Sequence, residues 1–271
     1  MSTTLDYKHD IPPIDEKSPP TYVEKDVFFS SDSVYSSDTP STLVNDGSFH
    51  EGTNFHINAR GHELVRLPLP SSQLEIEITD SVGNLVYISK REKRCSGNAV
   101  LSHIKLGDLV STSYFFGPNR DPVIQMLRPM DASMNSIKVN TRWRTRAVAF
   151  TLADGKTFQW FYLANTKDKD GRKINVIALR QVEAGEERLK KKEKPKIKVI
   201  AKLTRSAETR TEGTSRTTAG NGGQLVLDED VASYLNECVV VATCLMMLKK
   251  EIDRRRGLQM AVIAGGASGG N

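Results

Sequence analysis

The stretch that decides the fold is Cys238-Val239-Val240-Val241-Ala242-Thr243-Cys244-Leu245-Met246-Met247-Leu248, in which only Thr243 is polar. Acidic residues precede it and basic residues follow it, which suits the dipole of a single helix. We predict that this helix covers 228–256, with Asp228 as its N-cap and Gly257 at its end. A helix that is apolar on every face must be buried on every face.

Lipid and the interior of a protein are the two places that can bury such a helix. The apolar run spans only ~16 Å at 1.5 Å per residue, whereas the hydrocarbon core of a bilayer is about 30 Å thick. Extending the run back to Val231 includes Ser233, Asn236 and Glu237. The sequence therefore predicts no transmembrane span, and it places the helix in the lumen of a β-barrel.

The residues before the helix carry the pattern of short β-strands. Leu74-Glu75-Ile76-Glu77-Ile78 alternates between apolar and polar residues, and Asp154-Gly155 joins two β-prone runs as a tight hairpin would. We expect the domain to be mainly β, with a first alternation from Asn54 to Ile57. Ten strands are predicted at 74–78, 85–88, 99–104, 109–116, 122–127, 137–140, 147–152, 157–163, 173–180 and 196–203.

The remaining segments are polar. Residues 1–52 hold three basic and ten acidic residues, a net formal charge of −7, so the rest of the chain carries +12 to reach the total of +5. We predict a disordered tail over 1–52, a barrel domain over 53–257 with a flexible insertion at 204–224, and a flexible tail over 258–271. Three cysteines form no disulfide framework and the N-terminus has no secretory signal, so we expect a cytoplasmic or nuclear protein.

About ten strands followed by one apolar helix resemble the tubby C-terminal-like superfamily, which includes tubby proteins, phospholipid scramblases and LURP-one-related proteins. Leu227-Asp228-Glu229-Asp230 and Ala242-Thr243-Cys244-Leu245 resemble the scramblases, and 116–120 resembles fungal proteins of the superfamily. The resemblance covers about 54–256 and implies a closed antiparallel barrel of 10–12 strands around the helix. At 219–224 the chain lacks the carboxylates of the scramblase calcium loop, so the resemblance does not extend to calcium binding.

Two basic clusters are candidates for binding anionic phospholipid. Arg142, Arg144 and Arg146 alternate with other residues, so on a strand they would share one face while Trp143 points inward. The second cluster is Lys190, Lys191 and Lys192. The alternatives are a solvated barrel face for the arginines, and a solvated linker or a nuclear import signal for the lysines.

Pro19-Pro20-Thr21-Tyr22 in the acidic tail matches the Pro-Pro-x-Tyr ligand of WW domains. Successive prolines favour a polyproline II helix, and the tyrosine Tyr22 would fill a second slot. The partner that this motif predicts is a WW-domain protein, such as a ubiquitin ligase of the HECT type. The alternative is a chance match in a proline-rich segment.

No motif in the chain predicts catalysis. The five histidines lie in no nucleophile or metal pattern, and Gly220-Asn221-Gly222-Gly223 lacks the lysine of a phosphate loop. We expect no cofactor, no metal and no nucleic-acid partner. The sequence therefore predicts a non-enzymatic binding or adaptor module on an anionic, phosphoinositide-containing membrane. The alternatives are scramblase-like lipid translocation and a protein-only adaptor.

Overall fold

The structure is a computed structural model of the chain. It describes residues 49–69, 72–94, 96–115, 117, 121–128, 136–141, 145–163, 166–168, 170–182, 198–233 and 235–268, the side chains of 266–268 excepted. The predicted disordered tail lies outside these residues except for 49–52. Glu51 and Gly52 already belong to the first strand, so the folded domain starts earlier than the predicted residue 53.

Twelve strands form one closed barrel in which each strand pairs with its neighbours in the sequence and the first pairs with the last. All neighbouring pairs are antiparallel. The strands are β1 Glu51–Ile57, β2 Glu75–Asp80, β3 Leu85–Lys90, β4 Ala99–His103, β5 Gly107–Ser113, β6 Val123–Met126, β7 Ser136–Asn140, β8 Val148–Thr151, β9 Thr157–Leu163, β10 Asn175–Val182, β11 Val199–Arg205 and β12 Gly223–Asp228. The prediction of a closed antiparallel barrel is confirmed.

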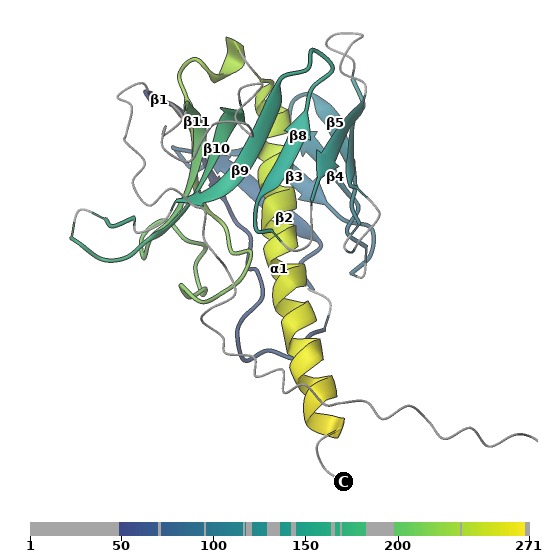
Figure 1. Cartoon of the computed structure of the whole chain (residues 1–271). Helices are drawn as coiled ribbons and strands as arrows, with labels where there is room; N and C mark the ends of the chain where they lie inside the picture. Colours follow the sequence, from purple (N-terminus) through teal and green to yellow (C-terminus); the bar gives the residue numbers. More distant parts are fainter. Residues whose placement is uncertain are drawn as a thin grey trace, which may run out of the picture. The chain divides into compact units, whose positions relative to one another are not determined.

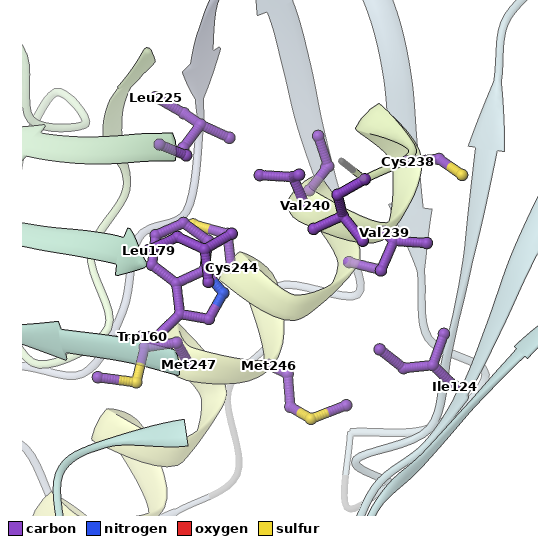
Figure 2. Packing of buried hydrophobic residues seen from close by; sticks show 14 of the residues in the cluster. Ile124, Trp160, Leu179, Leu225, Cys238, Val239, Val240, Cys244, Met246 and Met247 are labelled. Carbon is purple, nitrogen blue, oxygen red and sulfur yellow. The ribbon is translucent and has the colours of Figure 1, made fainter. Parts of the chain in front are cut away.

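The helix α1, Glu237–Ser268, runs through the barrel and continues beyond it (Figure 1). Its first three turns fill the lumen, where Val239, Val240 and Val241 are fully buried among inward-facing side chains of the strands (Figure 2). Trp160 of β9 donates a hydrogen bond from Nε1 to Thr243 Oγ1 at 3.0 Å, and that hydroxyl also donates to Val239 O at 2.8 Å. The one polar group of the apolar run therefore has partners inside the core.

The predicted helix limits are wrong at both ends. Asp228 is the last residue of β12, and its carboxylate accepts hydrogen bonds from the backbone of His50 and Asp230 at 3.0 and 3.1 Å. A 3₁₀ turn at Val231–Ser233 follows, and the Asn236 side chain caps α1 by accepting from Cys238 N at 3.0 Å. At the other end α1 passes through Gly257, because one glycine costs a helix only about 1 kcal/mol relative to alanine.

The predicted flexible insertion at 204–224 is also wrong. Its first residues end β11, its last two begin β12, and the connection between them is packed against the barrel. Thr211 donates from Oγ1 to Ile57 O at 3.1 Å, and a Cβ on Gly222 would lie 1.8 Å from that same carbonyl oxygen. The hydroxyl-rich composition reflects side chains that bond the backbone of their own turn, as Thr218 Oγ1 does with Ser215 N at 3.0 Å.

Candidate functional site

Alternating connections place every second chain reversal at the barrel end where α1 leaves, which we call the exit end. The connections at this end are 58–74, 91–98, 114–122, 141–147, 164–174 and 206–222, although parts of the first five lie outside the described residues. The turns at 81–84, 104–106 and 152–156 lie at the opposite end. Any group that leaves the barrel with α1 is therefore surrounded by loops from the whole circumference.

Seven of the described cationic side chains lie on or beside α1 at the exit end, and we call these seven the basic collar. Five come from α1 and two from the surrounding segments. The members are Arg91, Arg146, Lys249, Lys250, Arg254, Arg255 and Arg256.

The arginines and lysines of α1 point in different directions around its axis. Lys250 Nζ donates to Ala147 O at 2.6 Å, and Arg255 Nη2 donates to Thr217 O at 3.0 Å. Arg256 Nε donates to Pro68 O at 3.2 Å, on a third connection. These contacts hold the cations in a ring around the helix.

Within the described residues, the basic collar has a positive net formal charge. Asp253 is the one carboxylate that pairs with collar members in the described residues, at 2.6 Å from Lys249 and 3.5 Å from Arg256. Seven cations and one carboxylate leave this group with a net formal charge of +6. Backbone carbonyls orient Lys250, Arg255 and Arg256. The collar is therefore suited to an anionic partner.

A buried ion pair lies at the level where the collar meets the lumen. Arg205 of β11 donates from both terminal nitrogens to Glu251 of α1, at 2.7 and 2.9 Å. The same carboxylate accepts from Gly220 N at 2.7 Å and from the hydroxyl of Tyr162. Burial acts to raise the pKa of Glu251, but Arg205 and these donors hold it below its ordinary value. The pair fixes α1 to the barrel wall and adds no net charge.

The pKa of Lys250 provides a test of whether this part of α1 is buried in the barrel. Burial and the nearby Arg254 lower the pKa of Lys250 from 10.5 to about 8. Between pH 8 and 10.5 this amine is neutral in the folded chain and charged in the unfolded chain, so the unfolded state binds more protons and stability rises with pH. Urea titrations of the wild type and of Lys250→Met at several pH values measure this effect. The difference between their free energies of unfolding is expected to shift by ~3 kcal/mol in favour of the wild type between pH 8 and 10.5.

The control for this experiment is Lys250→Arg, because a guanidinium stays charged throughout the window. Relative to Lys250→Met it should show no such growth. If the difference in free energy of unfolding between the wild type and Lys250→Met does not change from pH 8 to 10.5, the Lys250 amine is exposed to water.

A small cavity of about 60 Å³ lies beside α1 at the exit end, between the helix and the wall formed by β2, β3, β4 and β5. Arg91, Tyr114 and Lys249 are among the residues that line it. Small-molecule sites typically measure 300–1,000 Å³, so this cavity has room only for a few water molecules. Whatever the collar binds must therefore be held on its surface.

Of the residues proposed from the sequence, Arg146 belongs to this site. It lies in the bend before β8 and not on a strand, so the predicted strand for the arginines is wrong at this position. The carbonyls of the neighbouring Thr145 and Ala147 accept hydrogen bonds from Arg254 and Lys250 of α1, and not from a neighbouring strand. The Arg146 guanidinium lies 5.6 Å from the centre of the Tyr162 ring.

Arg142, Arg144, Lys190, Lys191, Lys192, Pro19, Pro20 and Tyr22 lie outside the described residues. The strand ends that flank the lysines, Val182 of β10 and Val199 of β11, are at the end of the barrel opposite Arg146. Sequence reasoning missed the other six members of the collar. The five cations of α1 were interpreted as dipole partners, and Arg91 was not singled out. The signal that could have found them is five cations within 249–256 directly before a second apolar stretch.

Among the described residues, no three histidine, cysteine or acidic side chains gather as metal ligands would, and no helix is long and apolar enough to cross a membrane. Comparisons of the chain with protein-family models, curated proteins and solved structures find no match.

Proposed function

We propose that the protein is a non-enzymatic binding module that docks the exit end of its barrel onto an anionic phospholipid surface. The observation that carries this proposal is the basic collar, whose net formal charge of +6 surrounds the point where α1 leaves the barrel. Anionic headgroups attract such clusters with about 1 kcal/mol per lysine or arginine near the surface.

The shape of the site favours a surface over a small ligand. The collar cations diverge from α1 toward different connections, whereas a pocket for one phosphate would need them to converge. The cavity beside α1 is too small for a headgroup. A ring of cations around a protruding helix matches a plane of many negative charges.

The wider assignment also remains a proposal. A barrel around a C-terminal helix is the plan expected of the tubby C-terminal-like superfamily, and that resemblance supports a phosphoinositide as the anionic lipid. Arg142 and Arg144, which precede Arg146 in the chain, stay candidates for binding the same headgroups. The Pro19-Pro20-Thr21-Tyr22 motif would bring a WW-domain partner to the same membrane.

Charge reversal at the collar tests the proposal. Arg146→Glu with Arg254→Glu is expected to weaken co-sedimentation with phosphatidylserine vesicles by at least about 30-fold, since two lost cations are worth about 2 kcal/mol before any repulsion is counted. The same vesicles with part of the phosphatidylserine replaced by a phosphoinositide at equal total charge show whether the headgroup matters beyond its charge.

The matched control is Lys105→Glu with Arg128→Glu, which changes the net charge equally at the opposite end of the barrel, where both residues are exposed. This variant should bind like the wild type. Equal binding by the collar variant and the wild type would refute the proposal, and equal loss in both variants would reduce it to nonspecific charge attraction.

A further inference from the structure

Exposed apolar residues concentrate in two short segments just beyond the collar. Eight of the fourteen exposed large hydrophobic side chains in the described residues lie within 64–69 and 258–263. We call this group the apolar tip. Its members are Leu64, Val65, Leu67, Leu69, Leu258, Met260, Val262 and Ile263.

The two segments are joined to each other by hydrogen bonds. Gln259 Nε2 donates to Leu64 O at 2.9 Å, and Gln259 Oε1 lies 2.8 Å from His62 Nε2. Arg256 Nε holds Pro68 O at 3.2 Å. The polar groups of the tip are thus used to fix loop 63–69 against α1, and its aliphatic side chains are left on the outside, with Val65 96% exposed and Val262 75% exposed.

The apolar tip is almost free of charge, and the cations of the collar lie directly on its barrel side. Residues 257–265 carry no charged side chain, and 64–69 carry only Arg66. The collar cations Arg254, Arg255 and Arg256 come immediately before the apolar end of α1. Moving from the tip toward the barrel therefore leads from apolar side chains to cations, which is the order of hydrocarbon and anionic headgroups in a bilayer.

The spacing along α1 agrees with a bilayer. At 1.5 Å per residue, Leu258 lies ~6 Å and Ile263 ~13 Å beyond Arg254 along the helix axis. The headgroup region of a leaflet is about 5–8 Å thick, and interfacial segments bury their apolar groups about 5–10 Å into it. With Arg254 at the phosphates and α1 upright, Val262 and Ile263 would reach the acyl chains.

We propose that the apolar tip inserts into the acyl-chain boundary of the anionic membrane on which the collar docks. This inference rests on the proposed function and adds that α1, after filling the barrel, acts as the membrane anchor of the domain. Charge complementarity of the flanking collar selects an anionic bilayer as the occupant over a second copy of this equally basic surface.

The test compares the wild type and two variants of the full chain on phosphatidylserine vesicles at low and high salt. Val262→Asp with Ile263→Asp is expected to weaken binding about 100-fold, because two aliphatic side chains no longer leave water. The wild type should keep most of its binding at high salt, whereas binding by the tip variant should be lost. The second variant is Arg146→Glu with Arg254→Glu, which reports on the collar alone.

The matched control is Val82→Asp with Ile104→Asp at the opposite end of the barrel. Its side chains are equally exposed, at 82% and 52% against 75% and 54% for Val262 and Ile263. This control should bind like the wild type. If the tip variant binds normally while the collar variant does not, insertion is wrong and the proposed function stands. If neither variant weakens binding, both are wrong.

A second measurement reports whether residue 263 reaches the acyl chains of the bilayer. Ile263→Trp should add fluorescence that lipids brominated on their acyl chains quench, whereas Ile104→Trp should add fluorescence that they do not, each compared with the unsubstituted chain. Equal quenching of the two added tryptophans would overturn insertion. Insertion would also be overturned if sedimentation equilibrium showed a dimer of the wild type that is lost in the tip variant, while the tip variant still bound vesicles normally.

Discussion

Val240→Asp is expected to leave no cooperatively folded protein. Val240 is fully buried in the lumen of the barrel, where a carboxylate would have neither water nor a cation. Burying a carboxyl group without partners costs several kcal/mol even if the group takes up a proton, which is a large share of the 5–15 kcal/mol by which a domain is typically stable. Circular dichroism in the near ultraviolet and a urea titration should show no folded baseline.

The matched control lies on the same helix. Val262→Asp makes the same chemical change on the part of α1 beyond the barrel, where that valine is 75% exposed. Its unfolding free energy should change by less than about 0.5 kcal/mol, as is usual for surface positions. A folded Val240→Asp protein with normal stability would show that the lumen does not hold this segment.

Breaking the ion pair between Arg205 and Glu251 is expected to give the second large effect. Arg205→Met leaves the Glu251 carboxylate buried without its cation. It also removes the hydrogen bonds that Arg205 donates to Asn175 Oδ1 and Asn221 Oδ1, at 3.0 and 3.2 Å. The loss of one partner from a buried pair typically costs 3–5 kcal/mol. Urea unfolding at neutral pH measures this change in free energy.

Two further variants show whether the cost comes from the stranded charge. Arg205→Met with Glu251→Met should recover part of the stability, since no unpaired ion remains. Lys90→Met breaks the exposed pair with Glu75, 3.3 Å long, and should cost less than about 1 kcal/mol. If Arg205→Met costs no more than Lys90→Met, the ion pair does not fasten α1 to the wall.

Local patterns were sufficient to predict most of the wall of the barrel. Period-two alternation at 74–78 and the Asp154-Gly155 hairpin correspond to β2 and to the turn between β8 and β9, where Gly155 has a φ of 84°. All ten strands predicted between 74 and 203 are present as β2 to β11. The apolar run at 238–248 indicated the contents of the lumen because complete burial allows no polar face.

Tertiary context decided what the sequence pattern did not predict. β12 contains Leu225, Val226 and Leu227, but its neighbouring acidic residues suggested a helix start, and only pairing with β1 some 170 residues earlier makes it a strand. The grouping of Arg91 and Arg146 with the cations of α1 was not predicted for the same reason. Arg91 and Arg146 are far from α1 in sequence, and barrel closure brings them to it.

The position of α1 at the end of the chain constrains how the protein is made. A ribosome adds 5–20 residues per second, so β1 emerges about 10–35 s before its partner β12. Until residues 237–248 have also been translated, the strands have nothing to close around and their unpaired edges are open to aggregation. The barrel therefore closes only after nearly the whole domain has been translated.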